Sequence, residues 1–114
     1  MATLGIAVPL LPGKTQTWLE VAAQINGPRR KEMDEFHKRV GITTENWYLQ
    51  QTPQGDLIVL YLEGNIPQCF EELAKSDHPF DLWLKQVWLD TEGIDFGKPL
   101  PAPPPDVIYE SSAS

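Results

Sequence analysis

The chain contains very little cysteine, histidine and positive charge. Its 114 residues include one cysteine and two histidines, and nine basic residues stand against sixteen acidic ones, which gives a formal net charge of -7. The single cysteine, Cys69, cannot form an internal disulfide, so we expect a reducing compartment, the cytoplasm. A negative field opposes binding to phosphate backbones and to anionic lipid. We therefore expect neither nucleic acid nor a membrane as a partner.

Several common motifs are missing as well. The longest apolar stretch near the start, Leu4 to Leu11, is too short to span a bilayer, contains Pro9 and lacks a basic lead-in, so neither a signal peptide nor a transmembrane helix is expected. The histidines and the cysteine follow no metal-ligand spacing, and the glycines are too scattered to form a phosphate loop. We expect no cofactor and no metal.

Apolar residues make up 41% of the chain and charged residues 22%, which predicts one soluble globular domain over residues 1–114. Two expected strands are apolar on both faces, residues 57–62 clearly and residues 4–8 more weakly. Both faces of such strands must be covered. Because helices in so short a chain can cover only one face, we expect a second copy of the chain to cover the other. This predicts a homodimer.

The first helical region carries two apolar stripes in phase. The first has the spacing i, i+3, i+4, i+7 and consists of Trp18, Val21, Ala22 and Ile25. After Gly27-Pro28 the stripe resumes with Met33, Phe36 and Val40, eighteen residues and about five turns beyond Trp18. We expect a helix that is kinked or broken at Gly27-Pro28 and ends at Gly41 in a left-handed conformation.

The rest of the chain predicts two strands joined by a turn, a second helical region and a last strand. Strands at 43–51 and 57–62 flank a turn, and a helix opened by Pro67 restarts at Ser76–Pro79 and ends near Gly93. A proline-rich connector at 99–105, a fourth strand at 106–109 and a frayed tail at 111–114 follow. The order is βαββαβ, so we expect an α+β, ferredoxin-like domain with a four-stranded antiparallel sheet.

This layout, with the turn Pro12-Gly13-Lys14 after the first strand, resembles the dimeric α+β barrel superfamily. That superfamily includes the antibiotic-biosynthesis monooxygenases and the stress-responsive barrel proteins. Residues 41–47 and 77–83 are also similar to segments of uncharacterised bacterial proteins of this layout. The resemblance implies two ferredoxin-like sheets facing each other across a dimer, and it lends no activity.

His37 is the candidate catalytic residue. It follows Phe36 at the margin of the apolar stripe, where it could face the space between helix and sheet as a general base or a haem ligand. The alternative is a solvent-edge histidine next to the charged run 29–35. His78 precedes a proline and is expected to serve the helix restart, and Cys69 is expected to pack or to lie exposed rather than to act as a nucleophile.

Aromatic residues suggest a ligand pocket between helices and sheet. The expected ligand-binding residues combine rings with charged groups that would orient a ligand: Trp47, Trp83, Phe36, Tyr61, Arg39 and Glu45. Surface ion pairing is the alternative for the charged ones, and for Asp81 beside them. Trp88, next to Val87 and off the strict stripe, is interpreted as a dimer anchor or a pocket wall.

Three functional hypotheses follow from these residues. The first is a dimeric barrel protein that binds a small apolar or aromatic molecule in a cavity between helices and sheet. The second is an enzyme related to the cofactor-independent monooxygenases, with His37 as base and Trp47 or Trp83 as pocket wall. The third is a structural or interaction module. A polar group buried in an apolar cavity would favour the enzyme, whereas a cavity filled by side chains would favour the module.

Overall fold

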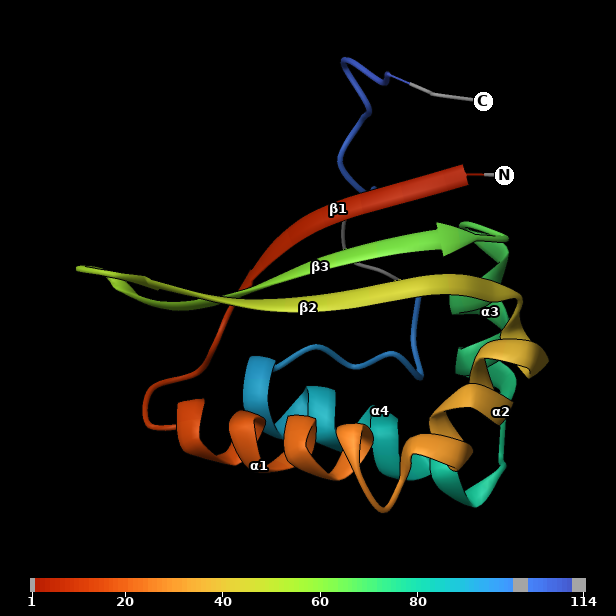
Figure 1. The fold of residues 1–114 in the computed structure, drawn as a ribbon, viewed down its shortest axis with the longest axis horizontal. Helices are drawn as coiled ribbons and strands as arrows, with labels where there is room; N and C mark the ends of the chain where they lie inside the picture. The colour runs from red at the N-terminus through yellow and green to blue at the C-terminus, as the bar shows by residue number, and fades with distance from the viewer. Residues whose placement is uncertain (1, 100–102, 112–114) are drawn as a thin grey trace.

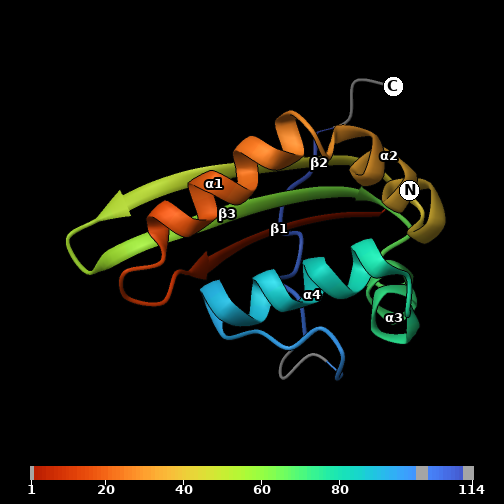
Figure 2. The ribbon, with the colours of Figure 1, turned by 90° about the horizontal axis from the view of Figure 1, so that it is seen from below.

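A computed structural model describes residues 2–99 and 103–111 and shows an α+β fold of four helices and a three-stranded antiparallel sheet. In chain order the elements are β1 (Ala2–Pro9), α1 (Thr15–Asn26), α2 (Arg30–Val40), β2 (Ile42–Thr52), β3 (Gly55–Gly64), α3 (Gln68–Lys75) and α4 (Pro79–Glu92). The order in the sheet is β1-β3-β2, and the helices all lie on one side of it (Figures 1 and 2).

The central position of β3 explains its apolar character. Its residues Ile58, Leu60 and Leu62 are buried against the helices, and they pair with alternate residues of β1 on one side and β2 on the other. Leu57 and Val59 point to the other face, which the helices leave uncovered and where they are half-buried. The helices thus cover one face of the sheet only, as the sequence predicts.

The first helical region is broken rather than merely kinked, and both boundaries follow from the sequence. The break lies between α1 and α2 at Gly27-Pro28, one of the two predicted outcomes. Gly41 ends α2 at φ 84° and donates its backbone N–H to the carbonyl of His37. A Cβ on Gly41 would lie 2.5 Å from Nδ2 of Asn65, so both the conformation and the space require glycine. The predicted left-handed cap is confirmed.

Most of the aromatic side chains build the core. Trp18 lies at its centre, with the ring centroids of Trp47 and Trp88 at 4.8 and 5.0 Å. Trp88 is 4% exposed and packs against Trp18 and Phe96, which excludes it as a surface anchor for a dimer. It forms instead the wall of an internal cavity.

The predicted fourth strand differs from the structure. Residues 106–109 belong to no strand, and the side chains of Ile108 and Tyr109 are 97% and 81% exposed. The segment crosses β1 between the two ends of the strand and rises to the side of the sheet opposite the helices (Figure 1), where the Thr3 hydroxyl donates to a carboxylate oxygen of Glu110 over 3.1 Å. Prolines 103–105 precede the segment and have no N–H to contribute to a ladder.

The expected proline-rich connector and frayed tail lie partly outside the described residues, at 100–102 and 112–114. Within the part of the chain that the structure describes, no helix has the length and apolar character needed to cross a membrane.

Candidate functional site

A groove of about 660 Å³ runs along the outer edge of β2, between this strand and the helices α1 and α2. Six consecutive residues of β2, Thr43–Tyr48, line it together with residues of both helices, among them Ile25, Met33 and His37. Side chains alternate between the two faces of a strand, so a groove lined by odd and even positions alike must reach around the strand's edge. It therefore exposes a ligand to the unpaired side of β2 as well as to the helices.

His37 and Glu45 meet in this groove. His37 projects from the last turn of α2, and its Nε2 lies 2.8 Å from Oε1 of Glu45 in β2. The second carboxylate oxygen accepts a hydrogen bond of 2.6 Å from the indole N–H of Trp47, two residues further along the same face. The Glu45 side chain is only 9% exposed. Each carboxylate oxygen thus has its own hydrogen-bond partner, which holds the Glu45 side chain in one orientation.

The hydrogen bond to Glu45 fixes the role of the second imidazole nitrogen. In the tautomer that donates from Nε2 to the Glu45 carboxylate, His37 has a lone pair on Nδ1. Nδ1 has no hydrogen-bond partner among the described residues, and it is not sealed from solvent. The arrangement is that of a base oriented by a carboxylate. His37 can therefore accept a hydrogen bond or a proton from a molecule in the groove.

The other predicted site residues lie elsewhere. Phe36 is buried in the core beside His37, with ring centroids 5.9 Å apart. Trp83 packs on Phe80 and carries the Arg29 guanidinium 4.2 Å from its ring centroid. Tyr61 stands in β3 next to Leu60 and Leu62, so it points to the face away from the helices. The groove thus contains His37, Glu45 and Trp47 of the predicted set.

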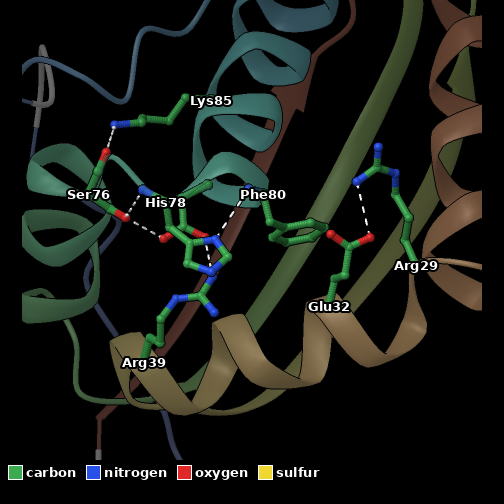
Figure 3. A network of polar contacts seen from close by, with 8 residues as sticks. Arg29, Glu32, Arg39, Ser76, His78, Phe80 and Lys85 are labelled. Carbon is green, nitrogen blue, oxygen red and sulfur yellow. Dashed lines mark hydrogen bonds and ion pairs between the residues drawn. The ribbon is translucent and has the colours of Figure 1, made fainter.

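Arg39 belongs to a second polar cluster, at the junction of α2, α3 and α4 (Figure 3). Its Nη2 donates to Oδ1 of Asp81 over 2.5 Å, and the Ser76 hydroxyl donates to the other oxygen over the same distance. Asp81 is 1% exposed. Lys85 reinforces the junction by donating to the carbonyl of Ser76 over 2.9 Å. The alternative for these residues was an ion pair at the surface. The ion pair of Arg39 with Asp81 exists, but its carboxylate is buried.

The cluster brings a serine, a histidine and an aspartate together without forming a catalytic triad. In a triad the histidine stands between the other two residues. Here Ser76 donates directly to Asp81, and Nδ1 of His78 accepts the backbone N–H of Phe80 over 3.3 Å, which caps the start of α4. Among the residues that the structure describes, no histidine accepts the hydroxyl hydrogen of Ser76, which goes to Asp81. The arrangement joins helices, and the predicted role of His78 in the helix restart is confirmed.

Nucleophilic and metal chemistry find no support among the described residues. Cys69 is buried, and this burial raises the pKa of its thiol to about 11, so it stays protonated and unreactive near neutral pH. No three histidine, cysteine, aspartate or glutamate side chains within residues 2–99 and 103–111 gather closely enough to hold a metal ion.

Comparison with known protein families, with curated proteins and with solved structures finds no match for this chain. The argument for function therefore depends on the geometry of the groove.

Proposed function

We propose that this protein binds a small organic molecule in the β2 groove, with an aromatic or apolar body beside Trp47 and a hydrogen-bond donor at Nδ1 of His37. The observation that carries the proposal is the chain of hydrogen bonds from Trp47 through Glu45 to His37, which ends in an imidazole nitrogen without a partner among the described residues. Such a chain holds the acceptor in one orientation before a ligand arrives.

The size and lining of the groove support a ligand rather than an interaction module alone. Its volume of about 660 Å³ falls in the range of pockets for small molecules. Its lining is more polar than apolar, with Ile25, Met33 and Trp47 as apolar contacts beside polar and charged side chains of α1, α2 and β2. Keeping Glu45 at 9% exposure requires the two donors that it has. This arrangement serves recognition, because a surface groove needs no nearly buried carboxylate for stability.

The enzyme alternative uses the same residues. A reaction of the cofactor-independent monooxygenase kind would need His37 to take a proton from the substrate, with Glu45 stabilising the imidazolium that forms. The alignment of His37 and Glu45 over 2.8 Å favours this second function over the other catalytic possibilities weighed above. Binding must come first in either case, so the binding experiment tests both.

The uncovered face of the sheet supports a homodimer of ferredoxin-like subunits arranged as in the dimeric α+β barrels. Leu57, Val59 and Tyr61 are half-buried there, and Tyr48 of the neighbouring strand is 55% exposed. Covering such a face removes apolar area from water. Light scattering after size exclusion should give about twice the chain mass of 12.9 kDa, and Val59→Lys should shift the protein to the monomer. A monomeric wild-type protein would contradict the dimer.

The ligand proposal is tested with phenol and toluene, which differ by one hydrogen-bond donor. Phenol should shift the ¹⁵N resonance of His37 Nδ1 and the indole resonance of Trp47, whereas toluene should leave His37 unchanged. We expect His37→Ala and Glu45→Gln each to weaken phenol binding about tenfold, the cost of one hydrogen bond to a charged or oriented partner. His78→Ala, outside the groove, is the matched control. Unchanged His37 resonances at saturating phenol would overturn the proposal.

A further inference from the structure

A second cavity lies on the other half of the molecule and shares no described lining residue with the β2 groove. Its volume is about 150 Å³, and it is a partly open pocket between the inner face of β1, β3, α3, α4 and the chain that follows α4. Its walls include Ile6 and Val8 of β1 and Trp88 of α4. The loop that follows α4 turns back along the outer side of this helix, at the β1 edge of the fold (Figure 2).

The described residues that line this cavity are all apolar. Three aromatic rings form a continuous wall: Trp88 meets Phe96 edge to face with centroids 5.3 Å apart, and Phe70 stacks on Phe96 at 5.8 Å. A water molecule needs two to four polar partners to stay in a buried site. These side chains offer none, except for the indole N–H of Trp88. The cavity therefore favours an apolar occupant over water.

We propose that this cavity is a binding site for a small apolar molecule of the size of one aromatic ring. Apolar cavities of about 150 Å³ in protein cores take up benzene or xenon and stay dry without them. The rings of Phe70 and Phe96 lie nearly parallel and that of Trp88 is almost perpendicular to Phe96, so a planar ring can stack on one and meet another edge to face. The proposal does not depend on His37 or on the function proposed for the β2 groove.

Two prolines of the segment that follows α4 also line the cavity. Pro103 and Pro104 belong to its lining, and residues 103–111 form no backbone hydrogen bond with other described residues. The side-chain contact of Thr3 with Glu110 is the hydrogen bond that holds this segment against the described part of the fold. Because proline has no N–H, the two residues can move aside without breaking a ladder. The structure thus provides a route of access for a ligand.

The experiment titrates the full-length protein with toluene and, separately, with xenon, and follows methyl resonances by NMR. We expect shifts at Leu4, Val8 and Ile94 and none at Ile25, which lies in the β2 groove. Val8→Phe, which places a ring in the cavity, should lower the affinity for toluene at least tenfold. Val59→Phe adds the same ring on the opposite face of the sheet and should leave the affinity within twofold.

Ile6→Phe is the second filling variant, since Ile6 lines the cavity but is half-buried and tolerates a larger side chain better than Val8. The proposal is overturned if saturating toluene and xenon leave the methyl groups of the cavity unchanged in the wild-type protein. It is also overturned if folded Val8→Phe and Ile6→Phe bind toluene as the wild type does. The phenol experiment measures binding at His37 in the β2 groove, so the proposal for the groove and the proposal for this cavity can fail independently.

Discussion

The two ends of α4 each bury a carboxylate, and they treat it in opposite ways. Asp81, in the first turn, is 1% exposed and accepts from Arg39 and Ser76. Glu92, the last residue of the helix, is 7% exposed. Among the described residues, its carboxyl group forms a hydrogen bond with Thr91 through Oε2, and its Oε1 has no hydrogen-bond partner. The helix dipole adds to the contrast, because it stabilises an anion at the N-terminus and destabilises one at the C-terminus.

At the C-terminal end of α4, the hydroxyl of Thr91 bears on whether Glu92 is protonated. It lies 2.7 Å from the carbonyl of Val87 and 2.5 Å from Oε2 of Glu92, yet it has one hydrogen to donate. If that hydrogen goes to Val87, the short contact to Glu92 requires a proton on the carboxyl group. Burial, opposed only by the contact with Thr91, raises the pKa of Glu92 to about 7. The comparison teaches that partners, more than depth, decide whether a buried carboxylate is charged.

The largest effect is expected from Asp81→Asn. The substitution keeps the shape of the side chain but leaves the Arg39 guanidinium without its carboxylate and interrupts the contact with Ser76. Breaking a buried pair in this way costs about 3 kcal/mol of unfolding free energy. Urea unfolding at pH 7 measures this loss, with Asp77→Asn, at an exposed position of the same junction, as control. Equal stabilities of the two variants would contradict the structural role of the cluster.

Glu92→Gln should act in the opposite direction. Burial raises the pKa of Glu92 to about 7 in the folded protein, whereas the pKa of a solvated glutamate carboxyl is 4.5. The folded state therefore binds more protons between these values, so wild-type stability falls as pH rises from 4.5 to 7. The difference of about 2.5 units corresponds to about 3 kcal/mol. Glutamine has no proton to lose, so the variant should escape this loss.

Thermal or urea unfolding of both proteins at pH 4 and pH 8 tests this prediction. The variant should match the wild type at pH 4 and exceed it at pH 8. Glu72→Gln, on an exposed part of α3, should change neither value. A wild-type stability that rises with pH relative to Glu92→Gln would show that Glu92 is charged in the fold, and it would remove the contrast with Asp81.

The smallest effect concerns the cap at the start of α4. Nδ1 of His78 satisfies the N–H of Phe80 next to Asp81, and loss of an N-cap acceptor costs about 1 kcal/mol. His78→Ala should therefore lower the unfolding free energy by about that amount, and His78→Ser should restore most of it. If serine were no better than alanine, the cap would add nothing and Asp81 alone would stabilise this end.

The local sequence pattern was sufficient to predict much of the fold. Apolar spacing predicted helices on both sides of Gly27-Pro28, and Gly41 was found from the end of the stripe at Val40. The restart before Pro79 was found from proline chemistry. The fourth strand was overestimated, because Val107, Ile108 and Tyr109 have strand propensity but find no partner in the described part of the chain.

The groove could be predicted only in part. Helical position placed His37 at the margin of a stripe, and alternation placed Glu45 and Trp47 on one face of a strand. Trp83 and Tyr61 were included because they are aromatic, yet composition does not show which side of a sheet or helix a ring occupies. Asp81 was read as a surface charge, since no local feature reports that Arg39, forty-two residues away in sequence, reaches it.

Up to the end of α4, the sequence by itself determined which segments form helices and strands and which of their faces are apolar, because these properties depend on neighbours within a few residues. Only the tertiary structure decided which polar groups meet. The pairing of His37 with Glu45, the pairing of Arg39 with Asp81, the raised pKa of Glu92 and the apolar cavity beside β1 all arise from side chains brought together by packing. Their chemistry depends on distance and burial, which a sequence does not record.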